Sequence, residues 1–99
     1  MMWVKVHHSY RDVIAICDSE LVGKTFEEGK RQIRITDYFF KGEEKNPEEV
    51  RELLVDGITE DSTFILVGEQ TIKIALEESV IQKEGIVTIQ EIPVSLMLL

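Results

Sequence analysis

The chain has 99 residues, of which 43% are apolar and 30% are charged, and its net charge is −8. This length predicts a single domain over residues 1–99 with one hydrophobic core, and this composition excludes wholesale disorder. No apolar run approaches the roughly 20 residues that a membrane-spanning helix needs, so we expect no membrane association. The single cysteine, Cys17, excludes an internal disulfide, which fits a cytoplasmic protein.

The negative charge lies in the second part of the chain. Residues 1–40 hold six acidic and six basic side chains, whereas residues 41–99 hold 13 acidic and five basic ones. Because nucleic-acid backbones are polyanions, binding them over a broad surface needs clustered lysine and arginine. We therefore do not expect broad nucleic-acid binding. Lys30, Arg31 and Arg34 could offer a small local patch, although solvated strand residues explain this group as well.

The N-terminal part of the chain has the patterns of strands. Trp3–His8 alternates in side-chain character, and Val13–Cys17 is apolar on both faces, as in a central strand. The two segments predict an opening hairpin. Residues 31–36 alternate again and predict a third strand, with Ile33 and Ile35 facing inward.

The clearest local signal is a helix that starts after Asn46. Asn46 is a good N-cap, Pro47 suits the first helical position, and Glu49 completes a capping box. An apolar stripe follows, and Gly57 is placed to end the helix. The acidic segment just before this helix, residues 42–46, predicts a mobile loop.

The last third of the chain predicts a strand over residues 62–68, a helix over residues 69–80 and a strand over residues 85–92 that ends at Pro93. The order of strand, helix and strand predicts a right-handed crossover with one parallel pair. The expected fold is therefore α+β. Its mixed sheet has about five strands, from the N-terminal hairpin, the third strand and a helix–strand–helix–strand segment, and two helices pack on one face.

Gly23, Lys24 and Thr25 raise the question of a nucleotide-binding loop. A phosphate loop needs a glycine five residues before the glycine of Gly-Lys-Thr, and here that residue is Asp18, whose carboxylate would repel a phosphate. We therefore reject this assignment. However, the segment from Asp18 to Thr25, which includes Glu20, crowds polar groups at the end of a buried strand, where sites form in sheets. A ligand- or partner-binding loop stays open, and so does an ordinary tight turn.

Other candidate sites are weaker. Gly68 and Glu69 lie where a strand enters a helix, and helix N-termini attract anions, although Glu69 can itself stabilise that end. His7 and His8 are adjacent and point to opposite faces of a strand, so they do not chelate one metal together. A Cys–His pair is disfavoured because Cys17 lies in an apolar strand. We predict no catalytic residue, no metal site and no cofactor.

Three segments occur in the order MWVKVH (residues 2–7), CDSELVGKTF (residues 17–26) and LVGE (residues 66–69). Together they resemble a small archaeal family of unassigned function, domain of unknown function 424, from Met2 to about Pro93. The resemblance implies an archaeal cytoplasmic protein with a loose link to translation or RNA processing. The residues that match the family are Cys17, Asp18, Glu20, Gly23, Lys24, Thr25, Gly68 and Glu69, and the resemblance gives none of them a catalytic role.

The chain departs from this family at two positions. It has Ile65 where the family often has Asn, and Val94 where the family often has His. Any site in the family that relies on that amide or that imidazole would be weakened here.

These observations predict a small acidic, non-catalytic binding or accessory protein that acts through protein partners. Its ligand- or partner-binding residues would be Asp18, Glu20, Gly23, Lys24, Thr25, Gly68 and Glu69. One alternative is a small-ligand-binding protein or an enzyme that uses the Asp18–Thr25 loop. Another is a structural homo-oligomer, because the apolar tail after Pro93 could add an edge strand, pack in the core or bury itself against another copy.

Overall fold

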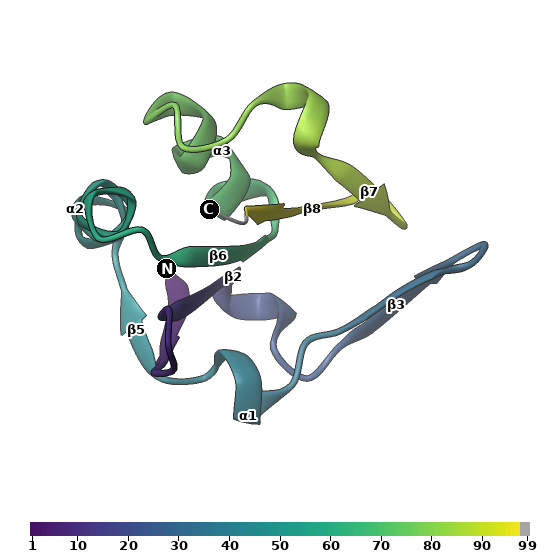
Figure 1. Ribbon diagram of the computed structural model, residues 1–99. Coiled ribbons are helices and arrows are strands. Elements are labelled where there is room, and N and C mark those ends of the chain that lie inside the picture. Colours follow the sequence, from purple (N-terminus) through teal and green to yellow (C-terminus); the bar gives the residue numbers. More distant parts are fainter. Residues whose placement is uncertain (98–99) are drawn as a thin grey trace.

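The computed structural model describes residues 1–97 (Figure 1). In chain order its elements are β1 (Met2–His7), β2 (Val13–Asp18), the short 3-10 helix η1 (Ser19–Leu21), β3 (Thr25–Glu28), β4 (Arg31–Arg34), α1 (Asp37–Phe40), β5 (Glu43–Lys45), α2 (Pro47–Thr59), β6 (Thr63–Val67), α3 (Glu69–Glu77), the 3-10 helix η2 (Lys83–Gly85), β7 (Val87–Ile89) and β8 (Ile92–Met97). Six strands form a sheet in the order β5-β1-β2-β6-β8-β7, and β3 and β4 form a separate hairpin. This confirms the α+β class and the mixed sheet.

The strand pairing explains how the sheet is mixed. β1 and β2 form the predicted antiparallel hairpin, with Met2 opposite Asp18 and His7 opposite Val13. β2 then pairs in parallel with β6, and the connection between them carries α2. β6 also pairs with β8, which follows α3 in the chain. These two strands are antiparallel. The parallel pair is therefore built around the first long helix rather than around α3.

The sheet separates two clusters of buried side chains. α2 and α3 cover one face, and η1, α1 and the β3–β4 hairpin lie on the other (Figure 1). Because side chains alternate along a strand, Val4 and Ile16 pack with the helices, whereas Ala15 and Cys17 pack on the opposite face. Both long helices thus lie on one face, as the sequence predicts.

Two predictions for the first half of the chain are wrong. Residues 42–46 do not form a loop, since β5 pairs with Met2–Val4 as an edge strand. The third strand does not join the main sheet. Instead, Arg31–Arg34 pairs with Thr25–Glu28, a strand that the polar composition of that segment concealed.

Two predicted ends of elements, one at Gly57 and one at Pro93, are also wrong. Gly57 does not end α2, which continues to Thr59. Gly57 is buried within the helix, where a Cβ would overlap the Phe64 ring, lying 3.0 Å from its Cε1, so this position requires glycine. Pro93 does not end the last strand, because the chain turns at Gln90 and Glu91, which both have positive φ, and Pro93 lies within β8.

The described part of the apolar tail, residues 94–97, forms part of the sheet. β8 lies between β6 and β7, so it is not an edge strand. Leu98 and Leu99, which belong to the predicted association surface, lie outside the described residues. Over residues 1–97, no helix has the length and apolar character that crossing a membrane would need.

Candidate binding surfaces

The carboxylate of Asp18 caps helix α3. Asp18 ends β2 and is only 3% exposed. Its Oδ2 accepts a hydrogen bond from the Gln70 backbone N–H at 3.0 Å, and its Oδ1 accepts from the backbone N–H and the hydroxyl of Thr71 at 2.9 and 2.8 Å. The first N–H groups of a helix lack partners within the helix and carry partial positive charge. Asp18 therefore occupies the position that an anionic ligand would take.

Gly68 makes room for this carboxylate. Its φ of 109° is one that side chains other than glycine rarely allow, and a Cβ at position 68 would lie 2.7 Å from each carboxylate oxygen of Asp18. The two residues follow Cys17 and Val67, which are partners in the parallel β2–β6 register. Glu69 is exposed in the first turn of α3, where its charge complements the helix dipole. The structure thus brings Asp18, Gly68 and Glu69 together.

The other predicted site residues lie away from this cap. Gly23, with φ of 90°, donates its N–H to the Ile35 carbonyl at 2.7 Å, and the Ile35 N–H donates to the Lys24 carbonyl at 2.9 Å. Thr25 then begins β3, so a strand follows the Gly-Lys-Thr segment where a phosphate loop requires a helix. Glu20 is exposed in η1. The Asp18–Thr25 loop is therefore divided between the α3 cap and the base of the hairpin, and its ligand-binding role stays a prediction.

Cys17 is a buried thiol in the core. Burial raises its pKa from 9.0 to about 12, and the negative charges of Asp18 and Glu20 add to this effect. Cys17 lies opposite Trp3, whereas His7 lies opposite Val13 at the other end of β1. No Cys–His pair is formed by these residues. In the described part of the chain, no group of three or more His, Cys, Asp or Glu side chains is arranged to hold a metal ion.

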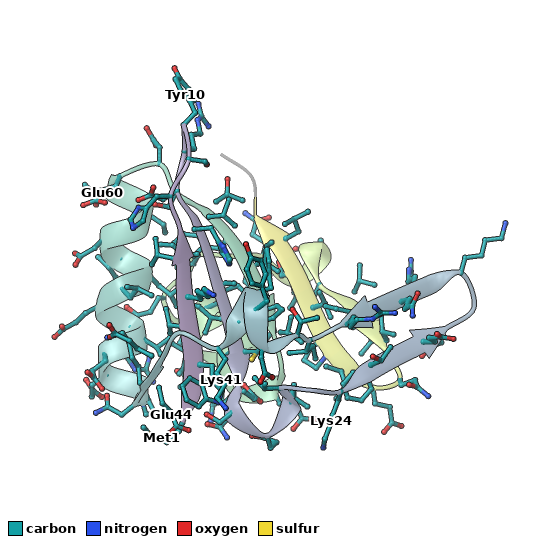
Figure 2. All side chains as sticks on the ribbon, turned by 90° about the horizontal axis from the view of Figure 1, so that it is seen from below. Met1, Tyr10, Lys24, Lys41, Glu44 and Glu60 are labelled. Carbon is teal, nitrogen blue, oxygen red and sulfur yellow. The ribbon has the colours of Figure 1, made fainter. Side chains whose placement is uncertain are left out.

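The β3–β4 hairpin projects from the body of the protein and carries unpaired positive charge (Figure 2). The basic side chains of the hairpin and of the residue just before it are Lys24, Lys30, Arg31 and Arg34. All four are exposed, and none forms an ion pair within residues 1–97. The two acidic side chains of the hairpin accept hydrogen bonds from neutral groups and keep their charge. Glu27 accepts from Gln32 Nε2 at 2.9 Å, and Glu28 accepts from the Gln90 N–H at 2.7 Å. The hairpin therefore presents net positive charge.

Beside the base of the hairpin, α1 and β1 form a strip of aromatic and cationic side chains, called here the aromatic strip: Trp3, Lys5, His7, Tyr38 and Lys41. The Lys5 Nζ lies 4.8 Å from the centroid of the Tyr38 ring and donates to the Tyr38 carbonyl at 2.6 Å. The Lys41 Nζ lies 5.4 Å from the centroid of the Trp3 ring. The Tyr38 side chain is 79% exposed. α1 and the hairpin lie on the same side of the sheet (Figures 1 and 2).

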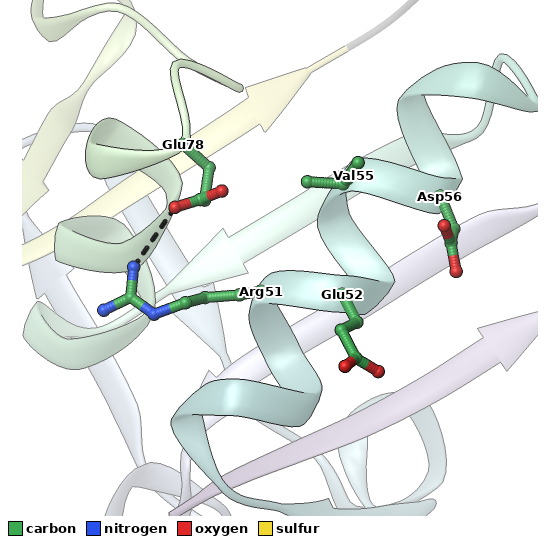
Figure 3. Close-up of a pocket in the computed structure, with 5 residues that line it drawn as sticks. All are labelled: Arg51, Glu52, Val55, Asp56 and Glu78. Carbon is green, nitrogen blue, oxygen red and sulfur yellow. Dashed lines mark hydrogen bonds and ion pairs between the residues drawn. The ribbon is translucent and has the colours of Figure 1, made fainter.

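A groove lies between α2 and α3 on the opposite side of the sheet (Figure 3). It has a volume of about 330 Å³ and is lined by Arg51, Glu52, Val55, Asp56 and Glu78. Arg51 bonds Glu77 at 2.8 Å and Glu78 at 3.3 Å, and these contacts raise its pKa. Among the described residues, Glu52 and Asp56 form no ion pair, and Val55 is 48% exposed. The groove is therefore acidic with an exposed apolar side chain.

The two long helices and the β3–β4 hairpin differ in charge. α2 and α3 together contain Glu48, Glu49, Glu52, Asp56, Glu69 and Glu77 against Arg51 and Lys73. The hairpin together with Lys24 contains four basic side chains and two acidic ones. The groove joins α2 to Glu78 after α3, and the aromatic strip joins β1 to α1, so neither arrangement is visible in the sequence.

Comparisons with known proteins place the chain in a family. No curated protein matches it significantly. A crystal structure of an uncharacterized conserved protein from Methanopyrus kandleri is similar in fold, with a TM-score of 0.79 and 18% identity over 97% of this chain and 89% of that chain. The model of a protein family of unknown function, DUF424, matches residues 7–99. The chain therefore belongs to the DUF424 family, which confirms the resemblance seen in its sequence segments.

Proposed function

We propose that this chain is a small, non-catalytic accessory protein that binds a protein partner through the groove between α2 and α3. The observation that carries the proposal is the composition of the groove, in which Val55 is exposed next to the unpaired carboxylates of Glu52 and Asp56. Grooves between helices are common docking sites for amphipathic segments. The complementary partner is a segment with both basic and apolar side chains.

The ion pairs of Arg51 support this role. Arg51 reaches from α2 to the end of α3 and bonds both Glu77 and Glu78, so these contacts link the two helices beside the groove. Arg51 meets two carboxylates, so this cluster keeps one negative charge, to which the carboxylates of Glu52 and Asp56 on the other flank of α2 add (Figure 3).

The proposed setting is the cytoplasm of an archaeon, where the accessory role would concern translation or RNA processing. This part of the proposal rests on the family resemblance. A reducing compartment is compatible with Cys17, which is a free and buried thiol.

The test is an affinity capture from lysate of the source organism, with and without ribonuclease. The wild type is compared with Glu52→Lys/Asp56→Lys and with the control Glu60→Lys/Glu84→Lys, which changes the charge equally at exposed positions outside the groove. We expect a protein that survives ribonuclease to be retained by the wild type and the control but lost by the groove variant. Equal retention by all three proteins, or no specific retention, would contradict the proposal.

A further inference from the structure

We propose that the aromatic strip, continued by the basic β3–β4 hairpin, binds a short segment of single-stranded RNA. This surface lies on the side of the sheet opposite to the α2–α3 groove, so the inference is independent of the protein-binding role proposed above (Figure 1). It would give the protein a second and chemically different partner.

Tyr38 is the proposed stacking residue. Its side chain is 79% exposed, and Lys5 lies over the ring at 4.8 Å from the centroid. Lys5 is held in this place because it also donates to the Tyr38 carbonyl. Unpaired bases of RNA are commonly bound by stacking on exposed aromatic rings, and a nearby cation is attracted both to the ring and to a phosphate. Tyr38 and Lys5 therefore supply both elements of such a contact.

The support beneath Tyr38 is fixed by packing. His7 stacks on Phe39 with a centroid distance of 4.4 Å and donates from Nε2 to the Phe39 carbonyl at 2.8 Å. Phe39 in turn packs edge to face against Phe40, which is 2% exposed in the core. The Thr36 hydroxyl accepts from the Phe39 N–H and caps α1. A ring that is positioned before binding loses little entropy when a base stacks on it.

The hairpin supplies the phosphate contacts. Its four basic side chains, Lys24, Lys30, Arg31 and Arg34, have no acidic partner in the described chain, and the hairpin follows directly along the same side of the sheet (Figure 2). Because the whole chain carries −8, a long polyanion would be repelled by the helical side. The excess of basic side chains on the hairpin, together with Lys5 and Lys41 in the strip, therefore fits a short segment that touches these residues, although Asp37 is also exposed beside Tyr38.

Single strands fit this surface better than duplexes. In a duplex the faces of the bases are stacked on one another, so an aromatic ring cannot reach them. RNA is the expected ligand because the loops and ends of RNA molecules present unstacked bases. DNA and duplex RNA serve as the competing ligands in the test.

The experiment uses the full chain and a fluorescein-labelled ten-nucleotide oligouridylate, with binding measured by fluorescence anisotropy at low salt. Tyr38→Ala should weaken binding by roughly tenfold through the loss of stacking, and Tyr38→Phe should restore it. The matched control is Tyr10→Ala, because Tyr10 is fully exposed but lies on the turn between β1 and β2, at the other end of the molecule from Lys41 (Figure 2). Arg31→Gln/Arg34→Gln should weaken binding and reduce its salt dependence.

Several outcomes would overturn the inference. They are no binding at low salt, equal losses for Tyr38→Ala and Tyr10→Ala, or equal affinity for a duplex of the same length. Equal affinity for the deoxy oligomer would overturn the assignment to RNA. The groove variant Glu52→Lys/Asp56→Lys should not weaken oligonucleotide binding, so failure here and failure of the proposed protein-binding role are distinguishable.

Discussion

The carboxylate of Asp18 fills the space next to the α-carbon of Gly68, where any other residue would place its Cβ. The cap requires both residues. Asp18 satisfies the first N–H groups of α3, and Gly68 lets the carboxylate approach them. The segments CDSELVGKTF and LVGE, which carry the family resemblance, thus meet at a structural cap of α3.

Substitution of Gly68 should be strongly destabilising. Gly68→Ala combines a backbone with φ of 109° and a methyl group that overlaps Asp18, so we expect a loss of at least about 2 kcal/mol in the free energy of unfolding. Urea unfolding measures this loss. Gly85→Ala is the matched control, since a Cβ there meets open space, and it should change the free energy by less than about 0.5 kcal/mol.

The double variant Asp18→Ala/Gly68→Ala tests the same relationship. Asp18→Ala alone should cost about 1–2 kcal/mol through the lost cap. Because Asp18→Ala also removes the overlap, the double variant should be more stable than the sum of the single losses predicts. Additive losses would show that the two positions do not interact.

Gly57 should tolerate alanine poorly, although it lies within a helix. At an exposed helical position the change from glycine to alanine stabilises by about 1 kcal/mol. In α2 the added methyl group would overlap the Phe64 ring, so Gly57→Ala should destabilise by about 1–3 kcal/mol. Phe64→Leu in the same chain should recover part of this loss. A stabilised Gly57→Ala variant, measured by urea unfolding, would contradict the packing seen here.

Local signals in the sequence predicted the elements better than their partners. The capping box is confirmed: Asn46 Oδ1 accepts from the Glu49 N–H at 2.9 Å, and Glu49 Oε1 accepts from the Asn46 N–H at 3.1 Å. These residues are three apart, so the pattern is visible in the sequence. The sequence wrongly predicts that Gly57 ends the helix, because the need for glycine there comes from Phe64, which lies in β6.

The same reason explains what was missed in the candidate sites. The sequence argues against a phosphate loop at Asp18, but it does not show the role of this carboxylate, because its bonds to Thr71 span 53 residues and depend on the parallel pairing of β2 with β6. The aromatic strip likewise joins Lys5 to Tyr38, which are 33 residues apart. A single sequence indicates which side chains are polar or aromatic, but it does not indicate which of them meet.

Cys17 should make the protein less stable as the pH rises above 9. Below the ordinary thiol pKa of 9.0 the group is protonated in both states and has no effect. Above it, the unfolded chain releases the proton whereas the folded protein retains it up to a pKa of about 12, so the unfolded state is favoured. The urea midpoint should therefore fall more steeply between pH 9 and pH 11 in the wild type than in Cys17→Ala. Parallel slopes for the two proteins would contradict the raised pKa.

Removal of the C-terminal tail should unfold the protein rather than dissociate it. Residues 94–97 of β8 pair with Phe64–Val67 of β6, and β7 is attached to the sheet through β8. A chain that ends at Pro93 would leave the edge of β6 unpaired and should lose its cooperative thermal transition in circular dichroism. Leu96→Ser is the control, because Leu96 is 58% exposed and its replacement keeps the strand. We expect this variant to melt like the wild type. If the wild type is an oligomer and this variant has the same mass by light scattering, the Leu96 side chain does not hold the copies together. A cooperative transition in the truncated chain would show that β8 is dispensable for the fold.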